Sequence, residues 1–160
     1  MEAKHEAFTF LYAGTEFGWP VLVVVACLLA FIQAMSGITQ EPNAMLYTID
    51  SLILLVTLPF YALTIQVSPG TVHWCLLFGL FPQTLQVASI QAIQIIALSP
   101  MDGYGVRGDG AKKLWRVSGS KAVVMELAEA SFVAFGTTNP LSLVNAIERA
   151  RSLVSKAKEP

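Results

Sequence analysis

Charged residues are scarce in this chain of 160 residues: they make up 13% of it, against about 25% in an average soluble domain. Hydrophobic residues make up 54%, and the mean hydropathy is +0.60. So apolar a composition excludes intrinsic disorder, and the two cysteines, Cys27 and Cys75, are too few for a disulfide framework. A net charge of -1 provides no field that would recruit nucleic acid. The composition is typical of an integral membrane protein.

Motifs for metal, cofactor or catalytic chemistry are also missing. His5 and His73 are the only histidines, and no Cys/His spacing suits zinc. The glycines between Gly103 and Gly110 lack the Lys-Ser/Thr pair of a phosphate-binding loop. No Ser, Thr or Asp is placed as part of a nucleophile constellation. We therefore expect no metal, no cofactor and no enzymatic activity; His73 becomes a candidate haem or chlorophyll ligand only if residues 71–98 form a helix.

Positive charge is absent from a long part of the chain. Between Lys4 and Arg107 there is no Lys or Arg at all. The other cations come later, interleaved with acidic residues: Arg107, Lys112, Lys113, Arg116, Lys121, Arg149, Arg151, Lys156 and Lys158. This asymmetry divides the chain into an apolar N-terminal region and a water-facing C-terminal module of mixed charge.

Two apolar runs predict membrane-spanning helices. The first covers Val21–Met35 with its flanks, and Trp19 before it is placed like an interfacial aromatic anchor. The second covers Ala44–Val67. The first has about 20 residues and the second has 24, so each is long enough to cross a hydrocarbon core of ~30 Å. Asp50 is expected at the membrane interface or in a helix cap, with a proton-carrying role as the alternative.

The residues around these runs set the expected domain boundaries. Residues 1–18 predict an interfacial tail, because the apolar segment Phe8–Tyr12 is too short to span. This tail is too long and too acidic for the n-region of a cleaved signal peptide, which is the alternative interpretation of the first run. A turn at Ile38–Asn43 separates the two helices, so we expect transmembrane helices over 19–60 and a cytoplasmic domain over 61–160.

Residues 71–98 admit two interpretations. The segment is apolar enough for a third span, although it contains Pro82 and several glutamines. Against a span, Thr64–Val67 and Thr71–Cys75 both alternate polar and apolar residues around Ser68-Pro69-Gly70, which is hairpin patterning. The sequence favours strands here.

The rest of the chain predicts strands followed by a helix. Strand patterning covers Lys112–Val117, Ala122–Leu127 and Ser131–Phe135. An amphipathic helix then begins at Asn139-Pro140, where a cap residue precedes proline at the first helical position. The pattern predicts a small, partly open β-barrel capped by a helix.

Several short segments carry a resemblance to a known family. They are Tyr104-Gly105-Val106-Arg107, Trp115-Arg116-Val117-Ser118-Gly119, Val123–Leu127 and Phe135–Pro140. The chain resembles an uncharacterised family of bacterial membrane proteins with two N-terminal transmembrane helices and a pleckstrin-homology-like domain. The resemblance implies a membrane α + β fold: a two-helix transmembrane hairpin, then a small pleckstrin-homology-like β-barrel capped by a C-terminal helix. It implies no activity.

These observations favour a non-catalytic accessory or scaffolding subunit of a larger bacterial integral-membrane complex, such as a respiratory or photosynthetic one. The alternative is a free-standing lipid-binding or sensor membrane protein. Because the cations follow the second span, the C-terminal domain of this multi-pass protein is expected on the cytoplasmic side of the bacterial inner membrane. Expected partners are other integral-membrane subunits and membrane lipids, and not nucleic acid.

Three sets of residues are candidate contacts. Small residues on one helix face, Ala26, Ala30 and Ala34, suit close helix packing. A long apolar run, Leu76–Leu85 with Trp74 at its edge, predicts a partner surface that includes Leu80 and Phe81. A basic group is expected to meet anionic lipid headgroups: Arg107, Lys112, Lys113 and Arg116.

Overall fold

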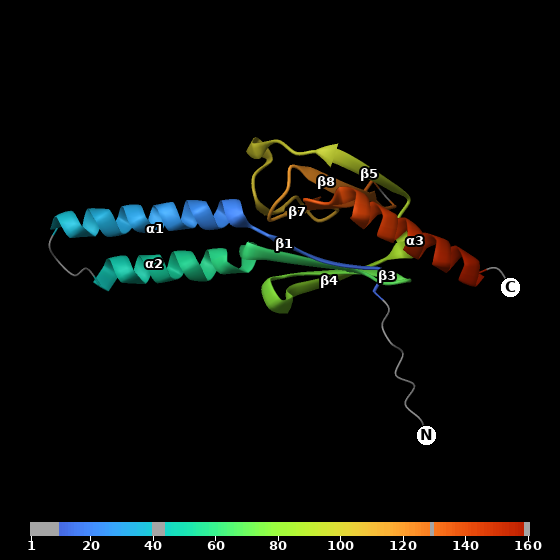
Figure 1. Cartoon of the computed structure of the whole chain (residues 1–160), viewed down its shortest axis with the longest axis horizontal. Helices are drawn as coiled ribbons and strands as arrows, with labels where there is room; N and C mark the ends of the chain where they lie inside the picture. The colour runs from blue at the N-terminus through green and yellow to red at the C-terminus, as the bar shows by residue number, and fades with distance from the viewer. Residues whose placement is uncertain (1–9, 40–43, 129, 159–160) are drawn as a thin grey trace, which may run out of the picture.

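The computed structural model describes residues 10–39, 44–128 and 130–158. These residues form strands in two sheets and three helices (Figure 1). In chain order the elements are β1 (Tyr12–Phe17), α1 (Trp19–Thr39), α2 (Ala44–Thr57), β2 (Ala62–Val67), β3 (Thr71–Leu76), β4 (Leu80–Gln86), β5 (Ala92–Ala97), β6 (Gly105–Arg107), β7 (Lys112–Arg116), β8 (Lys121–Glu126), β9 (Phe132–Thr137) and α3 (Pro140–Lys158).

The first sheet is an antiparallel meander in the order β1-β2-β3-β4. Its centre is the β2–β3 hairpin, which confirms the strand interpretation of this region and excludes a third span. Val67 pairs with Val72 across Ser68-Pro69-Gly70, so the turn falls where the sequence placed it. β1 pairs with β2 along its whole length. Residues 12–17 are therefore an edge strand rather than part of an interfacial tail; residues 1–9 lie outside the described residues.

The second sheet has the order β5-β8-β9-β7-β6. All its neighbours are antiparallel except β7 and β9, which run parallel with Trp115 opposite Phe135. The predicted strands at 112–117, 122–127 and 131–135 are confirmed to within a residue or two as β7, β8 and β9. The helix predicted after Asn139 is confirmed as α3.

The hydrophobic core lies between the two sheets and under α3. Strand alternation turns every second side chain of β2 inward, so Leu63, Ile65 and Val67 are fully buried. They meet residues of the second sheet such as Phe135. From α3, Leu143, Ala146, Ile147 and Ala150 complete the core at the spacing of one helix face.

The predicted β-barrel is wrong, because the strands form two separate sheets. The separation begins after β4, where the chain turns through Val87–Ser89. Val87 and Ile90 are buried at this turn, which carries β5 across to the other sheet. β5 then pairs with β8 and not with β4.

α1 and α2 form an antiparallel helical hairpin that projects from one end of the two sheets (Figure 1). In the described part of the chain, no helix combines the length and the apolar character needed to cross a membrane. The second apolar run divides at Leu58: α2 has 14 residues, about 21 Å at 1.5 Å per residue, and the run continues as a turn and then β2. This contradicts the predicted transmembrane hairpin and the multi-pass inner-membrane localisation that rested on it.

Candidate functional site

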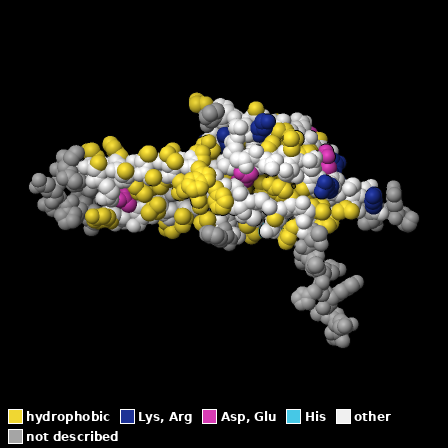
Figure 2. All heavy atoms as spheres, in the orientation of Figure 1, with side chains coloured by type: hydrophobic (Ala, Val, Ile, Leu, Met, Phe, Trp, Pro, Cys, Tyr) yellow, Lys and Arg dark blue, Asp and Glu magenta, His cyan; other side chains and the backbone are white. Residues whose placement is uncertain are grey.

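The helical hairpin presents apolar side chains to its surroundings. We call six of them the hairpin surface: Val23, Val24 and Phe31 on α1, and Leu52, Leu55 and Val56 on α2. All are exposed, and Figure 2 shows hydrophobic side chains along the length of the hairpin. α1 contains no charged residue and α2 contains only Asp50. The described side chains of the two helices therefore offer little charge to the surrounding water.

One face of α1 is less exposed than the rest of the helix. Among the described side chains of α1, the least exposed recur along this face: Val21, Val25, Leu29 and Ile32. Ala26, Ala30 and Ala34 all lie on exposed positions, so they are open to a partner and do not form the α1–α2 contact. Gln33 Nε2 donates a hydrogen bond of 2.5 Å to Asp50 Oδ2, which places Asp50 at the contact between the helices.

The base of the hairpin is tied firmly to the first sheet. The Gly18 amide donates to the Tyr61 carbonyl at 2.6 Å. The Tyr61 ring also packs against Phe17 and Trp19, with ring centroids 5.6 and 6.4 Å apart. A Cβ at Gly18 would lie 3.1 Å from the Phe60 carbonyl oxygen, a tight contact that glycine avoids. The base of the hairpin is thus fixed to the first sheet.

The partner surface predicted at Leu76–Leu85, with Trp74 at its edge, contains both buried and exposed residues. Trp74 and Leu76 are buried in the core, because β3 turns alternate residues inward, and their burial contradicts a partner-contact role. Leu80 and Phe81 on β4 are exposed. The register between β3 and β4 shifts by one residue here, and Phe81 has φ of +52°. A bulge therefore turns Phe81 outward.

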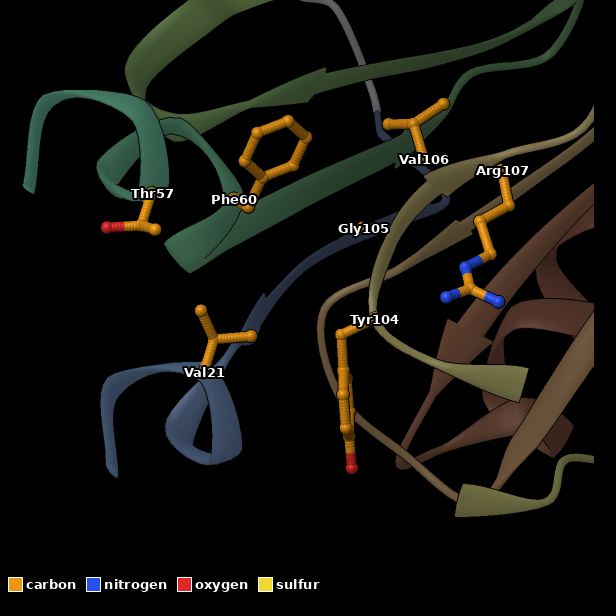
Figure 3. A pocket seen from close by; sticks show the side chains of 7 residues that line it. All are labelled: Val21, Thr57, Phe60, Tyr104, Gly105, Val106 and Arg107. Carbon is orange, nitrogen blue, oxygen red and sulfur yellow. The ribbon is translucent and has the colours of Figure 1, made fainter. Parts of the chain in front are cut away.

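Two adjoining cavities lie near the base of the hairpin in the described part of the chain. The hairpin cavity, of about 270 Å³, lies between Val21, Thr57 and the loop of Tyr104 (Figure 3). The strand cavity, of about 340 Å³, opens between β4 and β7. Phe60 and Val106 line both. The strand cavity is otherwise lined by Leu76, Phe81, Gln83, Lys113 and Trp115.

The four predicted headgroup cations do not form one basic patch. Arg116 is 3% exposed, and its guanidinium donates to the carbonyls of Ser99 at 2.7 Å and Gly119 at 2.9 Å. It also lies 4.7 Å from the centre of the Tyr104 ring. This burial contradicts a headgroup role for Arg116.

The remaining cations keep some exposure. Arg107 and Lys112 are exposed, and Lys113 is half-buried beside the strand cavity. Figure 3 shows the Arg107 side chain running back towards the loop of Tyr104 at the edge of the hairpin cavity. These three side chains remain candidates for contact with an anion.

The buried carboxylate of Glu16 was not among the residues predicted from the sequence. Glu16 on β1 accepts hydrogen bonds from Ser118 Oγ at 2.7 Å and Thr137 Oγ1 at 2.5 Å. The amide of Thr138 donates to the same carboxylate at 3.0 Å. Its partners follow it by more than 100 residues, so no local pattern marked it. This cluster joins the strand before the hairpin to β9.

The described residues hold no group of three or more His, Cys, Asp or Glu side chains that suits a metal ion. His73, on β3, has Nδ1 3.1 Å from the Thr84 hydroxyl. Since this region is a sheet, the helical arrangement that made His73 a ligand candidate does not occur.

Comparison with known proteins finds no matching protein family, no matching curated protein and no matching solved structure. The resemblance to the bacterial two-helix family stays a prediction.

Proposed function

We propose that this protein is a non-catalytic accessory or scaffolding subunit that joins a larger complex of bacterial integral-membrane proteins through the hairpin surface. One observation carries the proposal. The hairpin projects from the sheets, and its apolar side chains remain exposed on both helices (Figure 2). Contiguous apolar patches beyond a few hundred Å² on a folded chain usually mark an interface.

The chemistry of the hairpin supports an apolar partner. With Asp50 the single charged residue on the two helices, the hairpin offers few groups to a polar or charged surface. Subunits embedded in a membrane carry apolar flanks of the matching kind. The exposed Ala26, Ala30 and Ala34 let another helix approach closely. This mode of contact requires no membrane-crossing helix from this chain.

The β-sheets support the hairpin as a rigid base. The Gly18–Tyr61 hydrogen bond and the Glu16 cluster fix the start of α1 to both sheets. Because the base of the hairpin is fixed, less conformational entropy is lost when the hairpin binds a partner. A scaffolding role therefore fits the way in which the two parts are joined.

The test is copurification of the full chain in mild detergent, with partners identified by mass spectrometry. We expect integral-membrane subunits in constant ratio to the wild-type chain. The double variant Val24→Asp, Leu55→Asp should lose them, because two buried carboxylates at the contact are costly. The double variant Leu141→Asp, Leu153→Asp on α3 is the control; Val24 and Leu141 are both 66% exposed.

Two results would overturn the proposal. One is a wild-type chain that runs without integral-membrane partners. The other is equal loss of partners in both double variants. A circular dichroism spectrum of each variant checks that the fold is retained.

A lipid-binding or sensor protein is the second candidate function. Exposed Arg107 and Lys112 lie in the same part of the second sheet as exposed Tyr104 and Val106, and cations near anionic lipid contribute about 1 kcal/mol each. Flotation of the purified chain with phosphatidylglycerol vesicles, but not with phosphatidylcholine vesicles, would favour this function.

A further inference from the structure

The strand cavity has the features of a ligand site, and it is separate from the hairpin surface. We propose that it binds an acyl chain that ends in an anionic group, such as a long-chain carboxylate. Its volume of about 340 Å³ falls in the range of about 300–1,000 Å³ that is usual for small-molecule sites. The proposal does not depend on the proposed function, since none of its lining residues belongs to the hairpin surface.

The walls of the cavity suit an apolar chain. Five of the seven residues that line it are large apolar or aromatic residues: Phe60, Leu76, Phe81, Val106 and Trp115. The Trp115 ring is held in place because it packs edge-on against Trp74, with centroids 6.1 Å apart. A rigid wall of this kind is available to a ligand without reorganisation.

The charge at the cavity is positive. Lys113 and Trp115 are two residues apart on β7, so both side chains lie on the same face of the strand. Lys113 is half-buried and has no carboxylate partner in the described part of the chain. None of the described residues that line this cavity is acidic. An ammonium group with an apolar stem beside an apolar cavity is suited to an anion attached to an apolar chain.

The rim of the cavity contains a strained residue. Phe81 has φ of +52°, a region that non-glycine residues seldom adopt, and its side chain is 61% exposed. Residues in such sparsely populated backbone conformations cluster at active and ligand-binding sites. Here the bulge of β4 turns an aromatic ring to the cavity edge, where it would cover a bound chain.

The neighbouring hairpin cavity gives a longer chain room to continue. Phe60 and Val106 line both cavities, so the two are adjacent. Figure 3 shows Phe60, Val21 and Tyr104 around the hairpin cavity. The end that lies in the hairpin cavity would meet mainly apolar side chains, and the anionic end would lie at Lys113.

The experiment is calorimetric titration of the full-length chain with laurate below its micelle concentration. Lauryl alcohol supplies the same chain without the charge, and inorganic phosphate supplies an anion without the chain. We expect laurate to bind more tightly than lauryl alcohol, and phosphate not to bind. Lys113→Met should weaken laurate about tenfold, the usual loss for a hydrogen bond to a charged group, and leave lauryl alcohol unchanged. Lys121→Met, at an exposed position of β8 that lines neither cavity, should change neither.

Phe81→Gly provides a second variant that is expected to fold. Glycine adopts the φ of residue 81 without strain, so the melting temperature should hold or rise while both laurate and lauryl alcohol bind more weakly. The variant Val24→Asp, Leu55→Asp should bind laurate as the wild type does, which separates this site from the hairpin surface.

A parallel experiment with phosphatidylglycerol vesicles distinguishes a free fatty acid from a membrane lipid as the ligand. If monomeric laurate binds with the dependence on Lys113 and Phe81 described above, the ligand is a free acid. If only phosphatidylglycerol vesicles bind, with the same dependence, the chain belongs to a membrane lipid. Binding in neither form, or equal effects of Lys121→Met and Lys113→Met, would overturn the proposal.

Discussion

The carboxylate of Glu16 accepts a hydrogen bond of 2.5 Å from the hydroxyl of Thr137, a residue 121 positions later in the chain. Ser118 Oγ donates to the other carboxylate oxygen at 2.7 Å. Glu16 lies three residues before Trp19, where α1 begins. The buried side chain of Glu16 thus links the first sheet, the second sheet and the base of the hairpin.

Removing this carboxylate should destabilise the whole chain. Glu16→Leu leaves the hydroxyls of Ser118 and Thr137 without their acceptor, and each unsatisfied buried group costs about 1–3 kcal/mol. Glu16→Gln keeps one acceptor oxygen and should cost less. Urea denaturation followed by circular dichroism measures both. Glu148→Leu, at an exposed position of α3, is the control; a loss as large as that of Glu16→Leu would contradict the assigned role.

Tyr12 should make stability depend on alkaline pH. Burial raises the pKa of its phenol, and the nearby negative Glu16 raises it further, while a hydrogen bond with Thr137 lowers it. Because the pKa is higher in the folded state than in the unfolded state, this contribution is complete below about pH 10. It is lost as pH rises through the folded-state pKa.

The measurement is the free energy of unfolding between pH 8 and pH 11, values chosen to bracket the ordinary tyrosine pKa of about 10. Tyr12→Phe should flatten the alkaline decline relative to the wild type. Tyr47→Phe, at an exposed position of α2, should leave the decline unchanged. An unchanged profile in Tyr12→Phe would show that another group causes the decline.

Arg116 should behave as a structural residue. Its guanidinium donates hydrogen bonds to the carbonyls of Ser99 and Gly119 and lies over the ring of Tyr104. Arg116→Met should lower the free energy of unfolding by about 2–3 kcal/mol, as for lost hydrogen bonds to a charged group. Arg116→Lys should be intermediate, since one ammonium cannot reproduce the planar fork. Lys112→Met should be nearly neutral. If Arg116→Met has the same melting temperature as the wild type, the contacts of Arg116 do not stabilise the fold.

Gly119 should not tolerate a side chain. Its φ is +78°, and a Cβ would lie 2.4 Å from the carbonyl oxygen of Thr137. Gly119→Ala should therefore cost at least about 1 kcal/mol. At Gly70 a Cβ meets nothing within 4 Å, so Gly70→Ala should be neutral or slightly stabilising. Thermal melts of the two variants make the comparison, and equal melting temperatures would contradict it.

Elements that depend on local signals were predictable from the sequence. The β2–β3 hairpin follows from period-two alternation on each side of Ser68-Pro69-Gly70. α3 begins at Pro140 because Asn139 precedes it, with the amide of Ser142 donating to Asn139 Oδ1 at 3.4 Å. Each signal lies within a few residues of the structure that it specifies.

The candidate sites were less predictable, because exposure depends on what packs on each strand. Trp74 and Phe81 belong to one apolar stretch, yet the core buries the first and the β4 bulge exposes the second. Lys113 and Arg116 both belong to β7, but strand alternation and the Tyr104 loop separate their environments. Their roles could not be read from charge alone.

By itself the sequence determined the apolar helical hairpin, the turn at Ser68-Pro69-Gly70, most of the strands and the closing helix. Only the tertiary structure decided the placement of residues 12–17 as an edge strand, the parallel pairing of β7 with β9 and the burial of Glu16 and Arg116. The physical reason is range: helix periodicity and turn chemistry act over a few residues. Strand partners and buried polar contacts depend on groups brought together from distant parts of the chain, as in the link between Glu16 and Thr137.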